Sequence, residues 1–193
     1  MSTIASLVPS YFKSERKILV FGLDAAGKTT LFYKLRPASY QDNTAHFCSI
    51  GWYPEKMEIG NYKFISWDLG GQDRIAHLWK SFFPNTSALI FLIDCCDKER
   101  VEEAMQELYK MIRQEDLKHC PLLIYANKQD LKGSLTPYQI ALKLGLKHPL
   151  LETKEATLLS CAIHGVPWRI QPLVAITGTG AEPGLQWLLS KIN

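Results

Sequence analysis

Residues 22–29, which read GLDAAGKT, constrain the fold of this chain more than any other segment. They match the pattern G-x-x-x-x-G-K-[ST] in full, follow the apolar run 17–21 and precede the helix-forming stretch 30–35. In a strand–turn–helix unit, successive backbone N–H groups and a helix N-terminus point at one anion. The segment therefore predicts a loop that wraps phosphate groups. A glycine turn that merely caps a helix is the weaker alternative.

Each position of this loop suits a phosphate ligand. The two glycines let the backbone approach phosphate oxygens closely, Lys28 adds a full positive charge, and Thr29 offers a hydroxyl to Mg²⁺. The residues expected to line the phosphates are Gly22, Asp24, Ala25, Ala26, Gly27, Lys28, Thr29 and Thr30.

A second motif, WDLGGQ, follows a predicted hairpin arm at residues 67–72. An aspartate at the end of a strand, Asp68, can hold the magnesium shell, and Gly70 can offer its N–H to a γ-phosphate. Gln72 is expected to orient the attacking water, because phosphoryl transfer depends on positioning and charge stabilisation. Taken alone, this motif is more often a plain turn.

A third motif, NKQD, comes directly after the apolar run 121–125. Loops at the carboxyl ends of parallel strands build ligand sites, so Asn127, Lys128 and Asp130 are expected to read a base. The Asp130 carboxylate can accept hydrogen bonds from N1–H and the 2-amino group of guanine, a donor pair that adenine lacks. Alone, the motif would more often be a solvated loop, but about 100 residues after a complete phosphate loop it favours guanine.

The remaining pattern predicts the architecture. Short apolar runs at 88–93, 121–125 and 173–175 are typical of buried strands, and amphipathic stretches at 98–113 and 184–192 of helices. A hairpin at 58–68, turning at Gly60-Asn61, adds an antiparallel strand. We therefore predict an α/β fold with a mostly parallel sheet and helices on both faces.

Composition narrows the alternatives. A chain of 193 residues is expected to form one compact unit, and its net charge of +3, from 22 basic and 19 acidic residues, gives no argument for nucleic-acid binding. Five cysteines without a CxxC pair suggest reduced thiols in a cytosolic compartment. No apolar stretch approaches the roughly 18–20 residues that span a bilayer. A cytoplasmic monomer is the expectation.

Four segments, GLDAAGKTTLFYKL, WDLGGQDRIAHLW, ERVEEAMQELYKM and ANKQDL, resemble the Arf and Arf-like branch of the Ras-like small GTPases. The resemblance runs from about residue 16 to the C-terminus. It implies a P-loop fold with a six-stranded sheet, one strand antiparallel, in a GTPase domain at 16–193. It also implies a GTP/GDP switch with Mg²⁺, slow hydrolysis, an exchange factor, an activating protein, effectors, and a role in vesicle traffic on the Golgi or other endomembranes.

Further roles follow from the resemblance by position. Ser49 takes the place of the hydroxyl that completes magnesium coordination in the GTP state, where the family usually has threonine. Ala175 and Ile176 lie in the loop whose backbone contacts the guanine oxygen. The implied catalytic group is Gln72 with Lys28 and Gly70. The implied effector patch is Trp52, Trp67 and Phe82, with membership of the core as the alternative for the last two.

Three departures from the family pattern stand out. The approach to Ser49, residues 36–48, is about three residues longer than usual, and residues 147–167 hold an insertion of roughly 14 residues, expected to be a surface loop. Position 2 is serine, which removes the usual N-myristoylation glycine. Apolar residues at helical spacing still make 1–15 an amphipathic segment, although Pro9 weakens a helix there. It is expected either to contact membranes reversibly or to dock on the protein itself.

Two functions are compatible with these motifs. The first is a switch that hydrolyses GTP slowly, since no arginine in cis is evident in the expected place and an activating protein would supply one. The second is a scaffold that binds guanine nucleotide constitutively, although Gln72 argues against it. An ATP-dependent P-loop kinase lacks support, because NKQD favours guanine.

Overall fold

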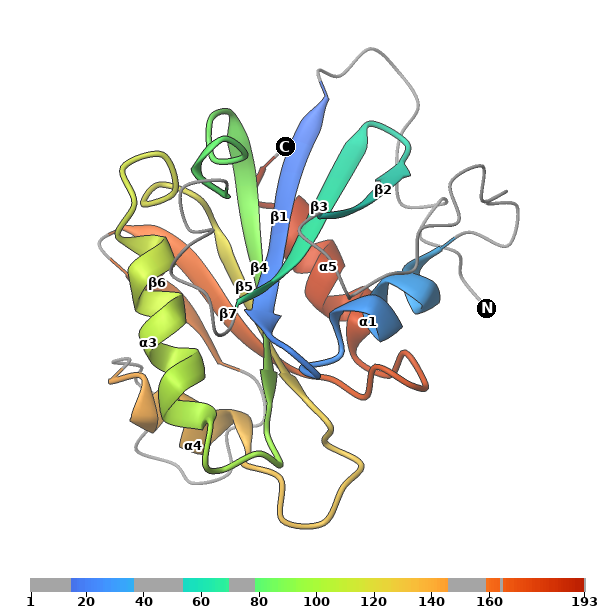
Figure 1. Ribbon diagram of the computed structural model, residues 1–193, viewed down its shortest axis with the longest axis vertical. Coiled ribbons are helices and arrows are strands. Elements are labelled where there is room, and N and C mark those ends of the chain that lie inside the picture. Colours follow the sequence, from blue (N-terminus) through green and yellow to red (C-terminus); the bar gives the residue numbers. More distant parts are fainter. Residues whose placement is uncertain (1–14, 37–53, 70–78, 146–158, 164, 193) are drawn as a thin grey trace.

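The structure is a computed structural model that describes residues 15–36, 54–69, 79–145, 159–163 and 165–192, with the backbone alone for 68–69 and 159–163 (Figure 1). The elements, in chain order, are β1 (Arg16–Leu23), α1 (Lys28–Leu35), β2 (Glu55–Ile59), β3 (Tyr62–Leu69), β4 (Thr86–Asp94), α3 (Val101–Ile112), β5 (Leu122–Asn127), α4 (Pro137–Lys143), β6 (Leu159–Ile163), β7 (Val166–Pro172) and α5 (Ala181–Leu189).

The strands form a sheet in the order β2-β3-β1-β4-β5-β7-β6. Strands β3, β1, β4, β5 and β7 are parallel, while β2 pairs antiparallel with β3 through the expected hairpin. Gly60 has a φ of 61° in this turn, which glycine adopts without a steric penalty. The predicted mostly parallel, six-stranded sheet is thus confirmed, and β6 adds a seventh strand, antiparallel to β7.

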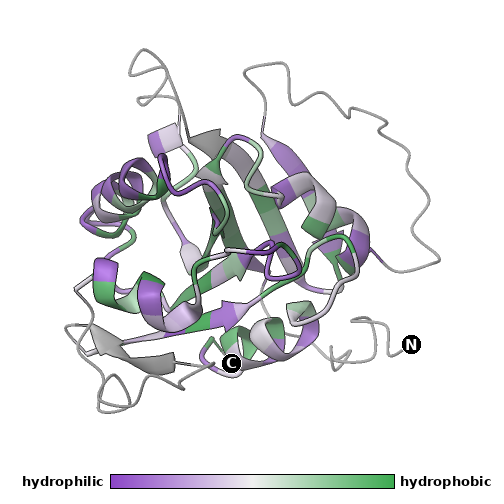
Figure 2. Cartoon of the chain, turned by 90° about the horizontal axis from the view of Figure 1, so that it is seen from below, coloured by the Kyte–Doolittle hydropathy of each residue, from purple (hydrophilic) through white to green (hydrophobic). Residues whose placement is uncertain are grey.

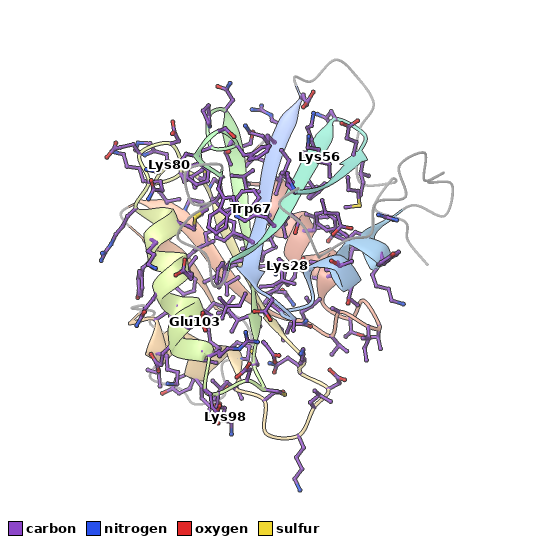
Figure 3. The ribbon with its side chains drawn as sticks, in the orientation of Figure 1. Lys28, Lys56, Trp67, Lys80, Lys98 and Glu103 are labelled. Carbon is purple, nitrogen blue, oxygen red and sulfur yellow. The ribbon has the colours of Figure 1, made fainter. Side chains whose placement is uncertain are left out.

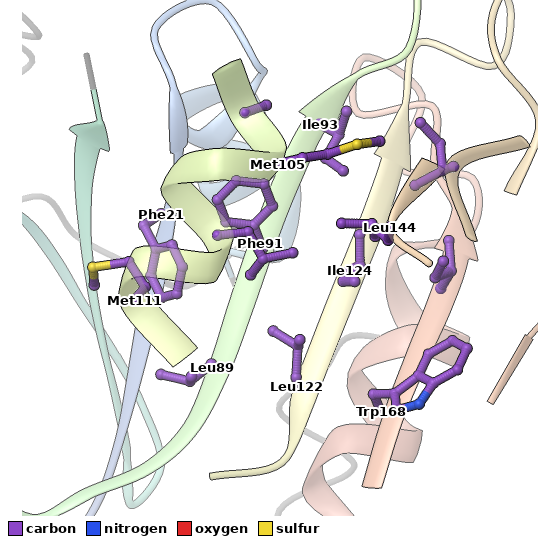
Figure 4. Close-up of a cluster of buried hydrophobic side chains, with 14 of the residues drawn as sticks. Phe21, Leu89, Phe91, Ile93, Met105, Met111, Leu122, Ile124, Leu144 and Trp168 are labelled. Atoms are coloured by element: carbon purple, nitrogen blue, oxygen red, sulfur yellow. The ribbon is translucent and has the colours of Figure 1, made fainter. Parts of the chain in front are cut away.

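Helices cover both faces of the sheet, α3 and α4 on one side and α1 and α5 on the other (Figure 1). Alternate residues of the central strands face opposite ways, so Phe21 and Phe91 pack under α3, whereas Val20 and Ile90 pack under α1 and α5. Figure 4 shows the first of these cores, and Figure 2 shows how apolar residues concentrate along the strands. Two apolar layers thereby hold the sheet rigid from both faces.

Two local expectations are corrected. The strand expected at 173–175 lies earlier, at β7, where the buried Trp168 and Ile170 alternate with Arg169 and Gln171, while 173–175 begin the following loop. Part of the expected surface loop at 147–167 is also strand, because β6 and the first residues of β7 fall within it. None of the helices in the described ranges is long and apolar enough to cross a membrane. Segment 1–14 lies outside the described residues.

The sheet brings the predicted motifs to one edge. Loops leave the carboxyl ends of β1, β4 and β5 at the same end of the sheet, the lower end in Figure 1. In the sheet, β1 lies between β3 and β4. The strands that follow β1 in the sequence are therefore added first on one side of it, up to β3, and then on its other side, from β4 onward. Such a switch point leaves a crevice in which α/β proteins bind ligands.

Candidate functional site

The loop between β1 and α1 is shaped by its two glycines. Gly27 ends the loop as the N-cap of α1 with φ 100° and ψ 19°, a left-handed conformation. A Cβ at Gly27 would clash with the Asn127 side chain, and one at Gly22 would clash with the backbone oxygen of Leu92. Ala25 also has a positive φ, of 58°. The loop is therefore tight and lies directly against β4 and the end of β5.

Lys28 is buried inside this loop, with 4% of its surface exposed. Its Nζ donates to the backbone oxygens of Gly22 and Leu23 at 2.8 and 2.5 Å, so the ammonium lies over the first residues of the loop (Figure 3). A buried ammonium needs such oxygen partners. Phosphate oxygens would offer the same ammonium a charged acceptor in place of carbonyls.

Thr29, the next residue, faces the start of β2. Its hydroxyl donates to a carboxylate oxygen of Glu55 at 3.2 Å, and the other oxygen of Glu55 lies 3.8 Å from the Arg36 guanidinium. Thr30 follows in the first turn of α1 and is half-buried. The hydroxyl expected to face a metal thus already has an acidic neighbour, which the motifs alone did not indicate.

Asn127 joins three segments that are far apart in the sequence. Its side chain is 2% exposed, donates from Nδ2 to the Ala26 oxygen at 2.7 Å, and accepts at Oδ1 from the Ala175 N–H at 3.0 Å. The phosphate loop, the NKQD segment and the loop after β7 are therefore held together by one amide. Both groups of the amide are satisfied, as a buried polar side chain requires.

The rest of NKQD is braced from β4. The Nζ of Lys128 lies 2.5 Å from an Asp94 carboxylate oxygen, and the backbone oxygen of Lys128 accepts from the Ser134 hydroxyl. Lys128 has a φ of 63°, a left-handed value that turns the chain sharply after β5. Asp130 is exposed beyond this turn. No sequence motif indicated Asp94 as a site residue, although Asp94 ends a buried apolar run just as Asn127 does.

Other predicted residues lie partly outside this description. Ala175 is buried and Ile176 is 63% exposed, side by side in the loop after β7. Asp68 pairs in register with Gly22, so its backbone lies beside the phosphate loop. Four of the predicted functional residues lie outside the described ranges: Ser49, Trp52, Gly70 and Gln72.

The two described members of the expected effector patch belong to an aromatic cluster. Trp67 is 7% exposed, and its ring centroid lies 6.1 Å from that of Phe82 and 6.3 Å from that of Trp79. Phe82 is partly buried and packs against the same core. The core alternative therefore describes Trp67 in this structure (Figure 3).

The donor set fits a magnesium–phosphate ligand better than a metal bound by protein alone. Among the described residues, no three His, Cys, Asp or Glu side chains gather as a metal site. Mg²⁺ in nucleotide sites takes one or two protein oxygens and completes its shell with phosphates and water. Thr29 at the start of α1 supplies that limited kind of set, and the backbone of Asp68 lies beside Gly22 in the neighbouring strand.

A comparison with protein-family models agrees with this geometry. The model described as the ADP-ribosylation factor family matches residues 1–192, nearly the entire chain. The match extends over the phosphate loop, the NKQD segment and the helices that cover the sheet. The chain therefore belongs to the ADP-ribosylation factor family of small GTPases.

Proposed function

We propose that this chain is a GTP/GDP switch that binds either nucleotide with Mg²⁺ and hydrolyses GTP slowly. GTPases of this family in general bind these nucleotides and magnesium. The observation that carries the proposal for this chain is the Asn127 amide, which ties the phosphate loop to the loop after β7. A nucleotide suits such a site, because its phosphates would meet the phosphate loop while its base would meet the loop after β7.

The proposed roles follow the loops. Backbone N–H groups of the phosphate loop and Lys28 bind phosphates, Thr29 binds magnesium together with Asp68 and Ser49, and Gly70 contacts the γ-phosphate. Bound magnesium would neutralise charge on the phosphate oxygens. The base would be bound by Asn127, Lys128, Asp130, Ala175 and Ile176.

Gln72 is the residue proposed to orient the water that attacks GTP. The described arginine beside the phosphate loop, Arg100, is engaged by two carboxylates, so it is not offered freely to a transition state. Intrinsic turnover is therefore proposed to be slow, with an activating protein supplying further charge. A Gln72→Leu variant that turns over GTP as fast as the wild type would instead favour the constitutive scaffold.

We also propose a role in vesicle traffic, with the protein cytoplasmic and peripherally associated with Golgi or other endomembranes. This part rests on family membership and on the apolar residues of segment 1–15. Sedimentation with liposomes, comparing the full chain with a variant carrying Leu7→Asp, tests the membrane contact. Equal sedimentation of the two proteins would refute the proposed membrane contact.

Nucleotide affinity tests the core of the proposal. We expect mass spectrometry of the purified protein to detect guanine nucleotide, and Lys28→Ala to weaken GDP binding about 10- to 100-fold, because a charge-assisted hydrogen bond is lost. Lys98→Ala, an exposed lysine beside the same edge, is the matched control (Figure 3).

Asp130→Asn tests base recognition separately. An amide cannot accept both donors of guanine, but its NH₂ group can donate to the 2-carbonyl of xanthine. We expect this variant to lose guanine affinity and to gain xanthine affinity, while Asp116→Asn, an exposed aspartate elsewhere, changes neither. Adenine nucleotide in the purified protein, or unchanged guanine affinity in Lys28→Ala and Asp130→Asn, would refute the assignment.

A further inference from the structure

A charged cluster joins the phosphate loop to the start of α3. The Arg100 guanidinium lies 2.7 Å from a carboxylate oxygen of Asp24, in the phosphate loop, and 2.7 Å from one of Asp97, in the loop after β4. The two contacts use different nitrogens, Nη1 and Nε, so the guanidinium bridges the two acids. None of the three motifs contains Arg100 or Asp97.

Asp97 fixes the position of Arg100. One oxygen of Asp97 accepts from the Arg100 side chain, and the other accepts from the Arg100 backbone N–H at 3.2 Å. These hydrogen bonds hold the pKa of Asp97 below its ordinary value, so the carboxylate stays charged. Arg100 also precedes α3 directly as its N-cap. The guanidinium is thus anchored to a rigid element on one side and reaches the phosphate loop on the other.

Asp24 occupies a sensitive place in that loop. The Leu23 oxygen, one residue earlier, accepts from the buried Lys28 ammonium. The lysine of such a loop reaches the β- and γ-phosphates. Asp24 would therefore lie near the terminal phosphates of a bound nucleotide, where an uncompensated carboxylate would repel the ligand. The carboxylate would repel a triphosphate more strongly than a diphosphate, because a triphosphate carries more negative charge at that end.

We propose that Arg100 is a positioning residue that holds Asp24 aside and neutralises it, so that the site accepts GTP as well as GDP. This inference rests on the proposed function and deepens it, because it assigns the balance between the two nucleotides to Arg100, a residue outside the three motifs that contacts Asp24. The competing possibility is that Arg100 serves only to begin α3 through Asp97, in which case its loss would weaken both nucleotides equally.

The test compares dissociation constants for GDP and for a non-hydrolysable GTP analogue, with Mg²⁺ present. We expect Arg100→Gln to shift the ratio of the two constants against the triphosphate by about five- to tenfold, the size of one uncompensated charge at a partly exposed site. Arg113→Gln, just after the other end of α3, makes the same chemical change and should leave the ratio unaltered. High salt should reduce the shift, because exposed charges are screened.

The double variant Asp24→Asn/Arg100→Gln separates the proposal from a folding effect. Removing the carboxylate removes the repulsion, so the ratio should return to within about twofold of the wild type. GDP affinity of Arg100→Gln reports whether the variant is folded. An equal loss of both nucleotides, or no recovery in the double variant, would overturn the inference. Failure of the wild type to bind either nucleotide would instead overturn the proposed function.

Discussion

Replacing Asn127 by alanine should loosen three loops at once. The change removes the donor to the Ala26 oxygen and the acceptor for the Ala175 N–H, and both backbone groups lie in a buried region. A buried polar group left without its partner costs about 1–3 kcal/mol. Two such groups, partly relieved by water entering the space, give an expected loss of about 2–4 kcal/mol in the free energy of unfolding.

Urea unfolding of nucleotide-stripped protein measures this loss directly, and the corresponding fall in Tm is about 5–15 °C for a chain of this size. Repeating the measurement with GDP then gives the change in affinity, since a ligand stabilises only the folded state that binds it. Gln186→Ala is the control, because its amide bonds Glu182 on the exposed face of α5. A surface change of this kind should stay within about 0.5 kcal/mol. If Asn127→Ala loses no more than this control, the amide does not hold the loops together.

Two further predictions concern the core and the thiols. A Cβ at Gly184 would lie 2.7 Å from the Tyr125 ring, so Gly184→Ala should lower the free energy of unfolding by about 1–3 kcal/mol through overpacking, and an unchanged urea midpoint would contradict the packing of α5 on β5. Burial raises the pKa of Cys95 to about 12 and that of Cys120 to about 11. Iodoacetamide at pH 8 should therefore label the half-buried Cys96 before either of these two thiols. Labelling of Cys120 should increase only as the pH approaches 11. Peptide mass spectrometry reads this order, and early labelling of Cys95 would refute it.

Much of the fold could be predicted because its signals are local. The change from an apolar run to glycines and then to helix-forming residues around the phosphate loop predicts both β1 and α1. Likewise, Gly60-Asn61 places the hairpin turn between β2 and β3. Each of these signals depends on neighbours in sequence, so no knowledge of the tertiary structure was needed.

The end of the sheet was harder to predict for a physical reason. Strand β7 has a partner on each side, β5 and β6, but one of its faces carries the half-buried Arg169 beside Trp187 of α5. Its sequence therefore lacks the continuous apolar run that marks β4 and β5. The run at 173–175 is apolar because Leu173 and Ala175 pack in the α1–α5 core, although they are not strand. Burial alone does not distinguish a strand from a buried loop.

The candidate site, like the fold, could be predicted from the sequence only in part. Motifs indicated the residues that would contact a nucleotide, because their spacing along one loop carries the geometry. The partners Glu55, Asp94 and Arg100 were missed, since they contact the motifs across 26, 34 and 76 residues of sequence. No local pattern encodes a contact between polar side chains that the tertiary fold brings together from distant segments.

These missed partners change how substitutions in the motifs should be interpreted. Lys28 has carbonyl partners within its own loop, so a nucleotide must exchange those hydrogen bonds for bonds to phosphate oxygens. The loss of affinity in Lys28→Ala therefore measures the difference between the two sets of contacts, and not the lysine–phosphate attraction alone. The same holds for Thr29 with Glu55, and for Lys128 with Asp94. Affinity at this site therefore depends on an exchange of partners at these three side chains, in addition to the new contacts that a nucleotide would make with the backbone N–H groups of the loop.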